Sequence, residues 1–171
     1  KYHNFIDSKE LKISYIENSS VEISNLSSSS YFFLGARKYD IQKSNKFFYE
    51  IDFTFQNANS ERTSSYGISF NFENYENNLN FCVSPDNMFS IYKTTSGDFF
   101  DIKKWTYNKN INTKHNKLKI LFDDSKTIFY VNNEIVFISE DLNPEIINFS
   151  PYISPGLTVK INSIKLNELL N

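Results

Sequence analysis

Apolar and polar residues alternate along most of this chain, and this period of two is the feature that most constrains its fold. The stretch LKISYI alternates strictly: Leu11, Ile13 and Tyr15 would share one face of an extended chain, opposite Lys12 and Ser14. Successive side chains of a β-strand point to opposite faces, whereas an amphipathic helix needs a period near 3.6 residues. No convincing helical pattern of three turns is present. The alternation therefore predicts an all-β protein.

The alternating segments are short and bounded by clusters of Asn, Ser, Asp or Pro, which is the spacing of a β-sandwich. The expected strands are 11–16, 21–26, 31–36, 47–55, 66–72, 78–83, 88–93, 117–123, 127–139 and 156–169. The chain has 171 residues, and its 17 Phe and 11 Tyr can supply a sizeable core. We therefore expect one domain over residues 1–171, in which residues 1–30 add N-terminal strands and a Ser-rich loop.

Two local signals fix finer details of this expectation. Segment 127–139 is a predicted hairpin whose turn is Asn132-Asn133, because asparagine tolerates the positive φ angles of a type I′ turn. In the last segment, Asn162-Ser163 interrupts the alternation, which predicts a β-bulge. The residues expected in the core are Ile51, Phe53, Phe55, Phe70, Leu118, Ile120, Val159 and Ile161.

Composition argues against several classes of partner and cofactor. The formal net charge is −2, which argues against nucleic acid as the main partner. The four glycines lie too far apart for a Gly-rich phosphate loop, and no run of about 18 apolar residues predicts a membrane span. The single Cys82 allows no intrachain disulfide. Because the chain starts at Lys1 rather than Met, we expect that a preceding segment was removed, together with any targeting signal. The lone cysteine fits a reducing compartment or equally a bacterial secreted protein, and we favour a secreted or cell-surface bacterial protein.

The second half of the chain carries a more specific pattern. The stretch KKWTYNKNINTKHNKLKILFDDSKTIFYVNNEIVF and the terminal GLTVKINSIKL resemble the closing half of a concanavalin A-like lectin/glucanase jelly roll, the fold of laminin-G-type modules. In such domains a Trp (here Trp105) often precedes an Asn-x-Leu strand (116–118) and a hairpin of the form fyvNGe (129–134). This chain has Asn133 where the family usually has Gly. The resemblance runs from about residue 31 to the end and implies a two-sheet antiparallel jelly-roll sandwich.

The resemblance also gives a meaning to the acidic pair in KFFYEIDFTF. Alternation places Glu50 and Asp52 on the polar face of their strand. Related glucanases carry Glu-x-Asp followed by a second Glu at the fourth or fifth position after the first, whereas this chain has Thr54 and Phe55 there. Retaining hydrolysis needs two carboxyls about 5–5.5 Å apart, so the expected catalytic pair is incomplete. We therefore expect no catalytic residues. The preferred interpretation of Glu50 and Asp52 is a structural, solvated face, followed by a polar ligand-binding face and then by a glycosidase site.

A sugar-binding surface needs polar groups for the hydroxyls and an aromatic ring for stacking. The candidate ligand-binding residues are Glu50, Asp52, Ser69, Asn71, Trp105 and Tyr107. We expect the first four to line one concave surface, with an aromatic side chain at its edge and Gly67 leaving room beside them.

The remaining reactive residues indicate little chemistry. His3 and His115 are the only histidines, and His115 lies in the lysine-rich KHNK, which is interpreted as a solvated loop. The whole lysine-rich stretch 103–119 is likewise interpreted as a soluble loop rather than a nucleic-acid surface. Cys82 is expected to be a buried, inert thiol. One Cys and two distant His residues argue against zinc.

No cofactor is expected, although calcium has three candidate positions in the predicted loops. These are Asp123-Asp124, Asp98 with Asp101, and Glu73 with Glu76, and each is also typical of turns. The sequence thus leaves three functions open. In order of preference they are a glycan-recognition module, a glycosidase or related sugar-processing enzyme of the same fold, and a protein–protein adhesion domain.

Overall fold

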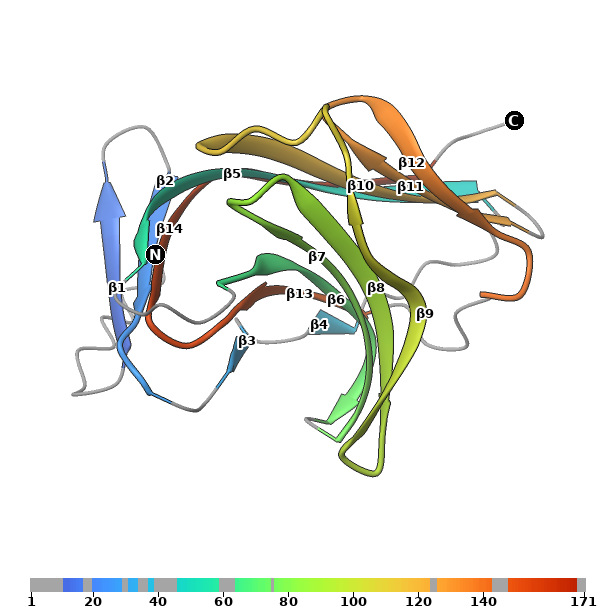
Figure 1. Cartoon of the computed structure of the whole chain (residues 1–171), viewed down its shortest axis with the longest axis horizontal. Coiled ribbons are helices and arrows are strands. Elements are labelled where there is room, and N and C mark those ends of the chain that lie inside the picture. Colours follow the sequence, from blue (N-terminus) through green and yellow to red (C-terminus); the bar gives the residue numbers. More distant parts are fainter. Residues whose placement is uncertain are drawn as a thin grey trace.

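Two antiparallel β-sheets pack against each other in the computed structural model of this chain (Figure 1). The structure describes residues 11–16, 20–28, 31–33, 37–38, 46–58, 64–74, 76–123, 126–142 and 148–168. These residues form strands joined by turns and irregular segments, so the predicted all-β class is confirmed. They include no helix of the length and hydrophobicity needed to span a bilayer.

Each sheet combines strands from distant parts of the sequence. Sheet A has the order β1 (Leu11–Ile16), β2 (Ser20–Asn25), β14 (Leu157–Glu168), β5 (Lys46–Ala58), β10 (His115–Asp123), β11 (Lys126–Val131) and β12 (Glu134–Ser139). Sheet B has the order β3 (Phe32–Phe33), β13 (Asn148–Ile153), β6 (Tyr66–Asn74), β7 (Asn77–Ser84), β8 (Met88–Thr95) and β9 (Asp98–Tyr107), and β4 (Arg37–Lys38) also pairs with β13. The predicted two-sheet antiparallel sandwich is confirmed.

Apolar side chains from the facing sides of the two sheets form the core. Phe53 of β5 meets Tyr66 of β6 edge to face, with ring centroids 5.2 Å apart, and Phe122 of β10 meets Phe70 of β6 at 6.2 Å. All but one of the predicted core residues are buried. The exception is Phe55, which is only partly buried and stacks on Tyr66.

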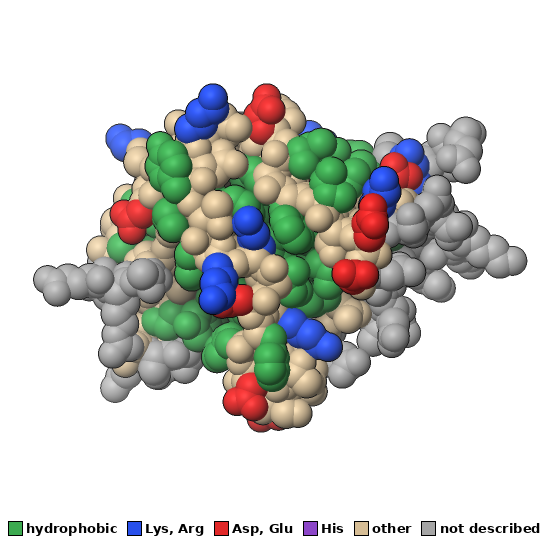
Figure 2. Space-filling view, turned by 45° about the vertical axis from the view of Figure 1, so that its right-hand side comes forward, with side chains coloured by type: hydrophobic (Ala, Val, Ile, Leu, Met, Phe, Trp, Pro, Cys, Tyr) green, Lys and Arg blue, Asp and Glu red, His purple; other side chains and the backbone are tan. Residues whose placement is uncertain are grey.

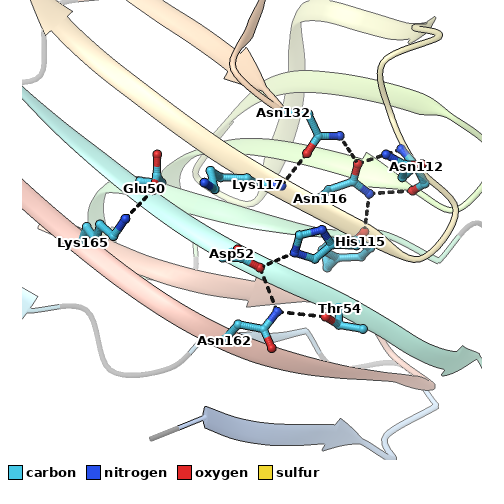
Figure 3. Close-up of polar contacts among 11 residues, drawn as sticks. Glu50, Asp52, Thr54, Asn112, His115, Asn116, Lys117, Asn132, Asn162 and Lys165 are labelled. Carbon is cyan, nitrogen blue, oxygen red and sulfur yellow. Dashed lines mark hydrogen bonds and ion pairs between the residues drawn. The ribbon is translucent and has the colours of Figure 1, made fainter. Parts of the chain in front are cut away.

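Both predicted backbone irregularities are present. Asn132 and Asn133 have φ angles of 52° and 70°, as a type I′ turn between β11 and β12 requires. The register between β14 and β5 shifts between Ile161 and Ser163, which confirms the predicted bulge. The side chain of Asn162, at the bulge, reaches the outer face of sheet A (Figure 3).

Three described strands were not predicted: the two-residue β4, β9 and β13. Of these, β9 corrects the interpretation of 103–119 as a loop. β9 covers 98–107, so the connection to β10 is only 108–114. The register between β8 and β9 shifts twice, and these irregularities remove the alternation by which a strand is recognised. β13 was missed because it is short, buried throughout and contains Pro151.

Some predictions fall on residues that the structure does not describe. His3 and Asp124 lie outside the described residues, as do parts of the Ser-rich run and of the predicted strand 31–36. For Glu73 the backbone is described as part of β6, but the side chain is not.

The curvature of sheet B decides which surface is hollow. In Figure 1 strands β6, β7 and β8 bow toward sheet A, so the side of sheet B that faces away from sheet A is concave. Residues that alternate with the core residues Ile68, Phe81 and Ile91 lie on this concave face.

Candidate ligand-binding site

The acidic and the neutral polar candidates lie on different sheets. Glu50 and Asp52 belong to β5 in sheet A, whereas Ser69 and Asn71 belong to β6 in sheet B. Glu50, Asp52 and Ser69 alternate with core residues, so the acidic pair and Ser69 lie on opposite outer faces of the sandwich. The expectation that these four residues line one concave surface is therefore wrong. Alternation determines which face of a strand a side chain occupies, but it does not determine which sheet the strand joins.

Asp52 is the centre of a polar cluster on the outer face of sheet A (Figure 3). Its Oδ1 lies 2.6 Å from Nε2 of His115 and accepts a hydrogen bond of 2.8 Å from Nδ2 of Asn162. Asn162, placed here by the bulge, also donates to Oγ1 of Thr54 at 2.9 Å. His115 is the first residue of β10 and pairs with Thr54, so its interpretation as a loop residue is wrong.

Glu50 has a cationic partner on the same outer face. Nζ of Lys165 lies 3.3 Å from Oε1 of Glu50, and Lys119 sits directly opposite on β10. The contacts of Glu50 and Asp52 are thus with amine, imidazole and amide groups, as in a charge-paired sheet surface. A role of these two residues in ligand binding stays a prediction, separate from the surface of sheet B.

The motif residues of the predicted Asn-x-Leu strand and hairpin hold a loop in place. Nδ2 of Asn116 donates to the hydroxyl of Tyr66 (2.8 Å) and to the carbonyl of Asn112 (2.6 Å). Its Oδ1 accepts from the backbone N–H of Asn112 (2.8 Å) and from Nδ2 of Asn132 (3.0 Å). Burial raises the pKa of Tyr66 to about 12, although the hydrogen bond from Asn116 acts in the opposite direction. These asparagines are structural, because they fix segment 108–114 between the two sheets.

The concave face of sheet B carries a row of mostly small polar side chains. One row crosses five strands through Ser150, Ser69, Asn80, Tyr92 and Asp101. Ser69 and Asn80 are buried, and Oδ1 of Asn80 has no hydrogen-bond partner among the described residues. An unsatisfied buried acceptor costs about 1–3 kcal/mol. This face therefore favours a ligand group or a water molecule that can donate a hydrogen bond.

Tyrosines flank this row where it approaches β13. Tyr152 is buried and stacks on the half-exposed Tyr31, with ring centroids 5.5 Å apart. Burial raises the pKa values of Tyr92 and Tyr152 well above their ordinary range. Cys82 lies on the same face and is buried as predicted, and this burial raises the pKa of its thiol.

Gly67 does not leave room for a ligand, contrary to our expectation. A Cβ atom at this position would lie 2.0 Å from the carbonyl oxygen of Phe81 on β7. The missing side chain therefore allows the neighbouring strand to approach closely. Ser69 and Gly67 lie on the concave side of β6 and are buried. Asn71 is partly accessible, but it has a φ angle of 49° where the register between β6 and β7 shifts, so alternation does not place its side chain.

Exposed aromatic side chains line the edge of the concave face along β9. Tyr107 pairs with Met88, and the neighbouring pair is Phe89 with Thr106. Because Phe89 points into the core, Met88 and Tyr107 face the concave side, and Trp105, two residues before Tyr107, faces the same side. Trp105 is 41% exposed and Tyr107 65% exposed. Phe99, 64% exposed, extends the line and contacts Tyr92 at 5.6 Å between ring centroids. We call Phe99, Trp105 and Tyr107 the aromatic rim.

Charges are mixed on the surface shown in Figure 2. Lys or Arg and Asp or Glu side chains are interspersed there with hydrophobic ones, without a broad field of one sign. Among the described residues, no three His, Cys, Asp or Glu side chains gather as a metal ion requires. Of the calcium candidates, Asp123 forms an ion pair with Lys46 at 3.0 Å, and Asp98 and Asp101 lie exposed on β9. Calcium binding stays a prediction.

Solved structures of sugar-binding and sugar-processing proteins share this architecture. Carbohydrate binding module CBM66 from Bacillus subtilis superposes with a TM-score of 0.62 at 13% identity, over 92% of this chain and 91% of that chain. Sheep galectin-11 gives 0.57 at 9% identity, over 84% and 100%. The Bacillus licheniformis β-glucanase gives 0.63 at 9% identity, over 92% and 82%. No family model and no curated protein matches the sequence.

The chain therefore has the concanavalin A-like jelly-roll fold that the sequence resemblance implied. At these identities the likeness shows the fold, and fold alone does not determine function. The sequence did contain the signal for the part of the site that was missed. The alternation in NLNFCV and MFSIYK already places Asn80 and Tyr92 opposite the core.

Proposed function

We propose that the concave face of sheet B binds a carbohydrate and that the aromatic rim stacks on its sugar rings. The observation that carries this proposal is the exposure of Trp105 and Tyr107 on one side of β9, beside the polar row. The apolar face of a pyranose covers an aromatic ring, and burying apolar surface contributes about 25 cal/mol per Å². Neighbouring amide and hydroxyl groups hydrogen-bond the sugar hydroxyls.

The spacing of the rim favours a chain of sugars over a single one. Side chains at alternate positions of a strand lie about 6.6–6.8 Å apart, so Trp105 and Tyr107 contact neighbouring units rather than one ring. An oligosaccharide running along β9 would meet both rings in turn. Asp101 offers a carboxylate further across the same face.

Recognition without cleavage fits the distribution of carboxylates. A glycosidase of the usual type needs two carboxyls flanking the scissile bond. The polar row contributes one carboxylate, Asp101, whereas Glu50 and Asp52 lie on the other sheet and contact Lys165 and His115. The carbohydrate-binding module and the galectin named above support the proposal at the level of the fold.

The test is a glycan array, followed by calorimetry on any ligand found, with three variants. Truncating a tryptophan that anchors a ligand costs about 2 kcal/mol or more, so Trp105→Ala should weaken binding about tenfold or more. Phe100→Ala is the matched control, because Phe100 is a 55% exposed aromatic on the same strand whose position pairs with Lys93 rather than with the polar row. Asp52→Ala should also leave binding unchanged.

The outcomes separate the three functions that the sequence left open. Binding that survives Trp105→Ala but is lost in Asp52→Ala would overturn the proposed site. Release of reducing sugar from a polysaccharide panel, abolished by Glu50→Gln, would instead indicate an enzyme. A silent array would favour a protein ligand.

A further inference from the structure

An apolar row crosses the outer face of sheet A, on the side of the molecule away from the proposed sugar site. Phe48 of β5 pairs with Leu121 of β10, Leu121 pairs with Ile128 of β11, and Ile128 pairs with Ile138 of β12. Each of these residues alternates with core residues, so the row faces outward. It ends at Ile138, whose side chain is 47% exposed.

A β-bulge brings a second exposed isoleucine to this face. The register between β11 and β12 shifts so that Phe129 pairs with Phe137 and Tyr130 pairs with Ile135, which leaves Val136 as the extra residue. Ile135 and Ile138 would otherwise point to opposite faces, because they are three positions apart. With the bulge both face outward, and Ile135 is 53% exposed.

The strand that carries these isoleucines is an edge of the sheet. β12 is the last strand of sheet A and has a neighbour on one side only among the described strands (Figure 1). Its sequence, EIVFIS, contains neither Lys nor Pro, the residues that usually protect an exposed edge. β12 is short and bulged, but the bulge turns both isoleucines to the outer face. An edge without Lys or Pro beside an apolar row is suited to pairing with another strand.

We propose that β12 pairs with β12 of a second copy of this chain, antiparallel and about a two-fold axis between Val136 and Phe137. This register places Ile135 opposite Ile138 of the other copy, twice, on the same outer face. It also places Glu134 opposite Ser139. The strand is thus complementary to itself, which is what a two-fold symmetric interface requires.

Neighbouring registers fail on two physical grounds. Side chains directly opposite each other in a sheet must lie on the same face. Glu134 pairs with the core residue Val131 and so lies on the inner face of sheet A. Moving the register by one residue in one direction would place Glu134 opposite Ile138, which lies on the outer face. Moving it in the other direction opposes Glu134 to Glu140, and like charges directly opposite destabilise a pair.

The size of the contact predicts a weak dimer. One six-residue strand and two half-exposed isoleucines from each copy bury less than about 1,200 Å², the low end of specific interfaces. We therefore expect dimers at protein concentrations on the order of ten micromolar and above. A two-fold axis perpendicular to the joined sheet would direct both concave faces to the same side, so both copies could contact one glycan-bearing surface.

Sedimentation equilibrium over a wide concentration range tests the dimer and its register together. The wild type should shift from 20.1 kDa toward twice that mass. Ile135→Lys with Ile138→Lys should remain monomeric, because lysines would face lysines. Ile135→Glu with Ile138→Lys should dimerise again, because the introduced glutamate would face the introduced lysine of the other copy. Ile164→Lys, at a 44% exposed isoleucine of β14, is the matched control and should dimerise like the wild type.

Three results would overturn the proposal. The first is that the wild type stays monomeric up to about 1 mM. The second is that the double-lysine variant dimerises as strongly as the wild type. The third is that the Glu/Lys variant is monomeric although circular dichroism shows that it is folded. The Glu/Lys variant carries as many new charges as the double-lysine variant, so a general effect of surface charge would change both alike. Sugar binding by monomer leaves this test unaffected, because the two surfaces lie on different sheets.

Discussion

Replacing Asn116 by Ala should destabilise the protein more than the loss of any single exposed side chain. The amide is buried, and its four hydrogen bonds join β10, the loop 108–114 and the hairpin turn to Tyr66 of the other sheet. The buried Tyr66 hydroxyl would lose this partner at a cost of about 2 kcal/mol. Each of the other three bonds involves groups nearer to water and contributes about 0.5 kcal/mol. The expected loss is therefore about 3–4 kcal/mol.

Urea unfolding followed by tryptophan fluorescence and circular dichroism measures this loss. Asn112→Ala is the matched control: it is the same change in the same loop, but only the backbone of Asn112 takes part in the network. We expect the control to change the free energy of unfolding by less than about 0.5 kcal/mol. A loss below about 1 kcal/mol for Asn116→Ala would refute the view that this amide holds the two sheets and the loop together.

Three further predictions concern single residues. Gly67→Ala should destabilise by about 3 kcal/mol or more, because the new Cβ would collide with the backbone of β7 at Phe81; thermal unfolding would show it, and an unchanged midpoint would contradict it. Stability should fall as the pH rises from 10 to 12, by about 2–3 kcal/mol from Tyr66 alone, because its pKa is 10.0 in the unfolded chain and about 12 in the folded one. Denaturant titrations at several pH values should show a shallower fall for Tyr66→Phe. Asn133→Gly should stabilise by up to about 0.5 kcal/mol, because its φ of 70° suits glycine; a lower melting temperature would count against this.

Patterns that span a few neighbouring residues were sufficient to predict much of the fold. The alternation predicted the class, its interruption predicted the bulge near Asn162, and the two asparagines predicted the turn at 132–133. Each of these features depends on local backbone geometry. β9 was not predicted because its two register shifts depend on its partner β8, which local alternation does not reveal.

The candidate site was harder to predict because it depends on strand order. Asp52 and Ser69 look equivalent in the sequence, each a polar residue between two core residues, yet they lie on different sheets. His115 was interpreted as a loop residue because it lies in the lysine-rich KHNK, and its contact with Asp52 arises only when β10 pairs with β5. Trp105 was chosen for its residue type, and although it is exposed on β9, its role in ligand binding stays a prediction.

The place of β14 has a consequence for how the chain reaches its folded state. β14 lies between β2 and β5, so its Ile161 pairs with Val21 on one side and with Phe53 on the other. Asn162 and Asp52, which hydrogen-bond across this junction, are 110 positions apart. Contacts this distant in sequence make folding slow, on the scale of milliseconds to seconds. During synthesis, the edges of β2 and β5 that pair with β14 lack their partner until β14 has left the ribosome. In that interval the nascent chain is most exposed to aggregation and proteolysis.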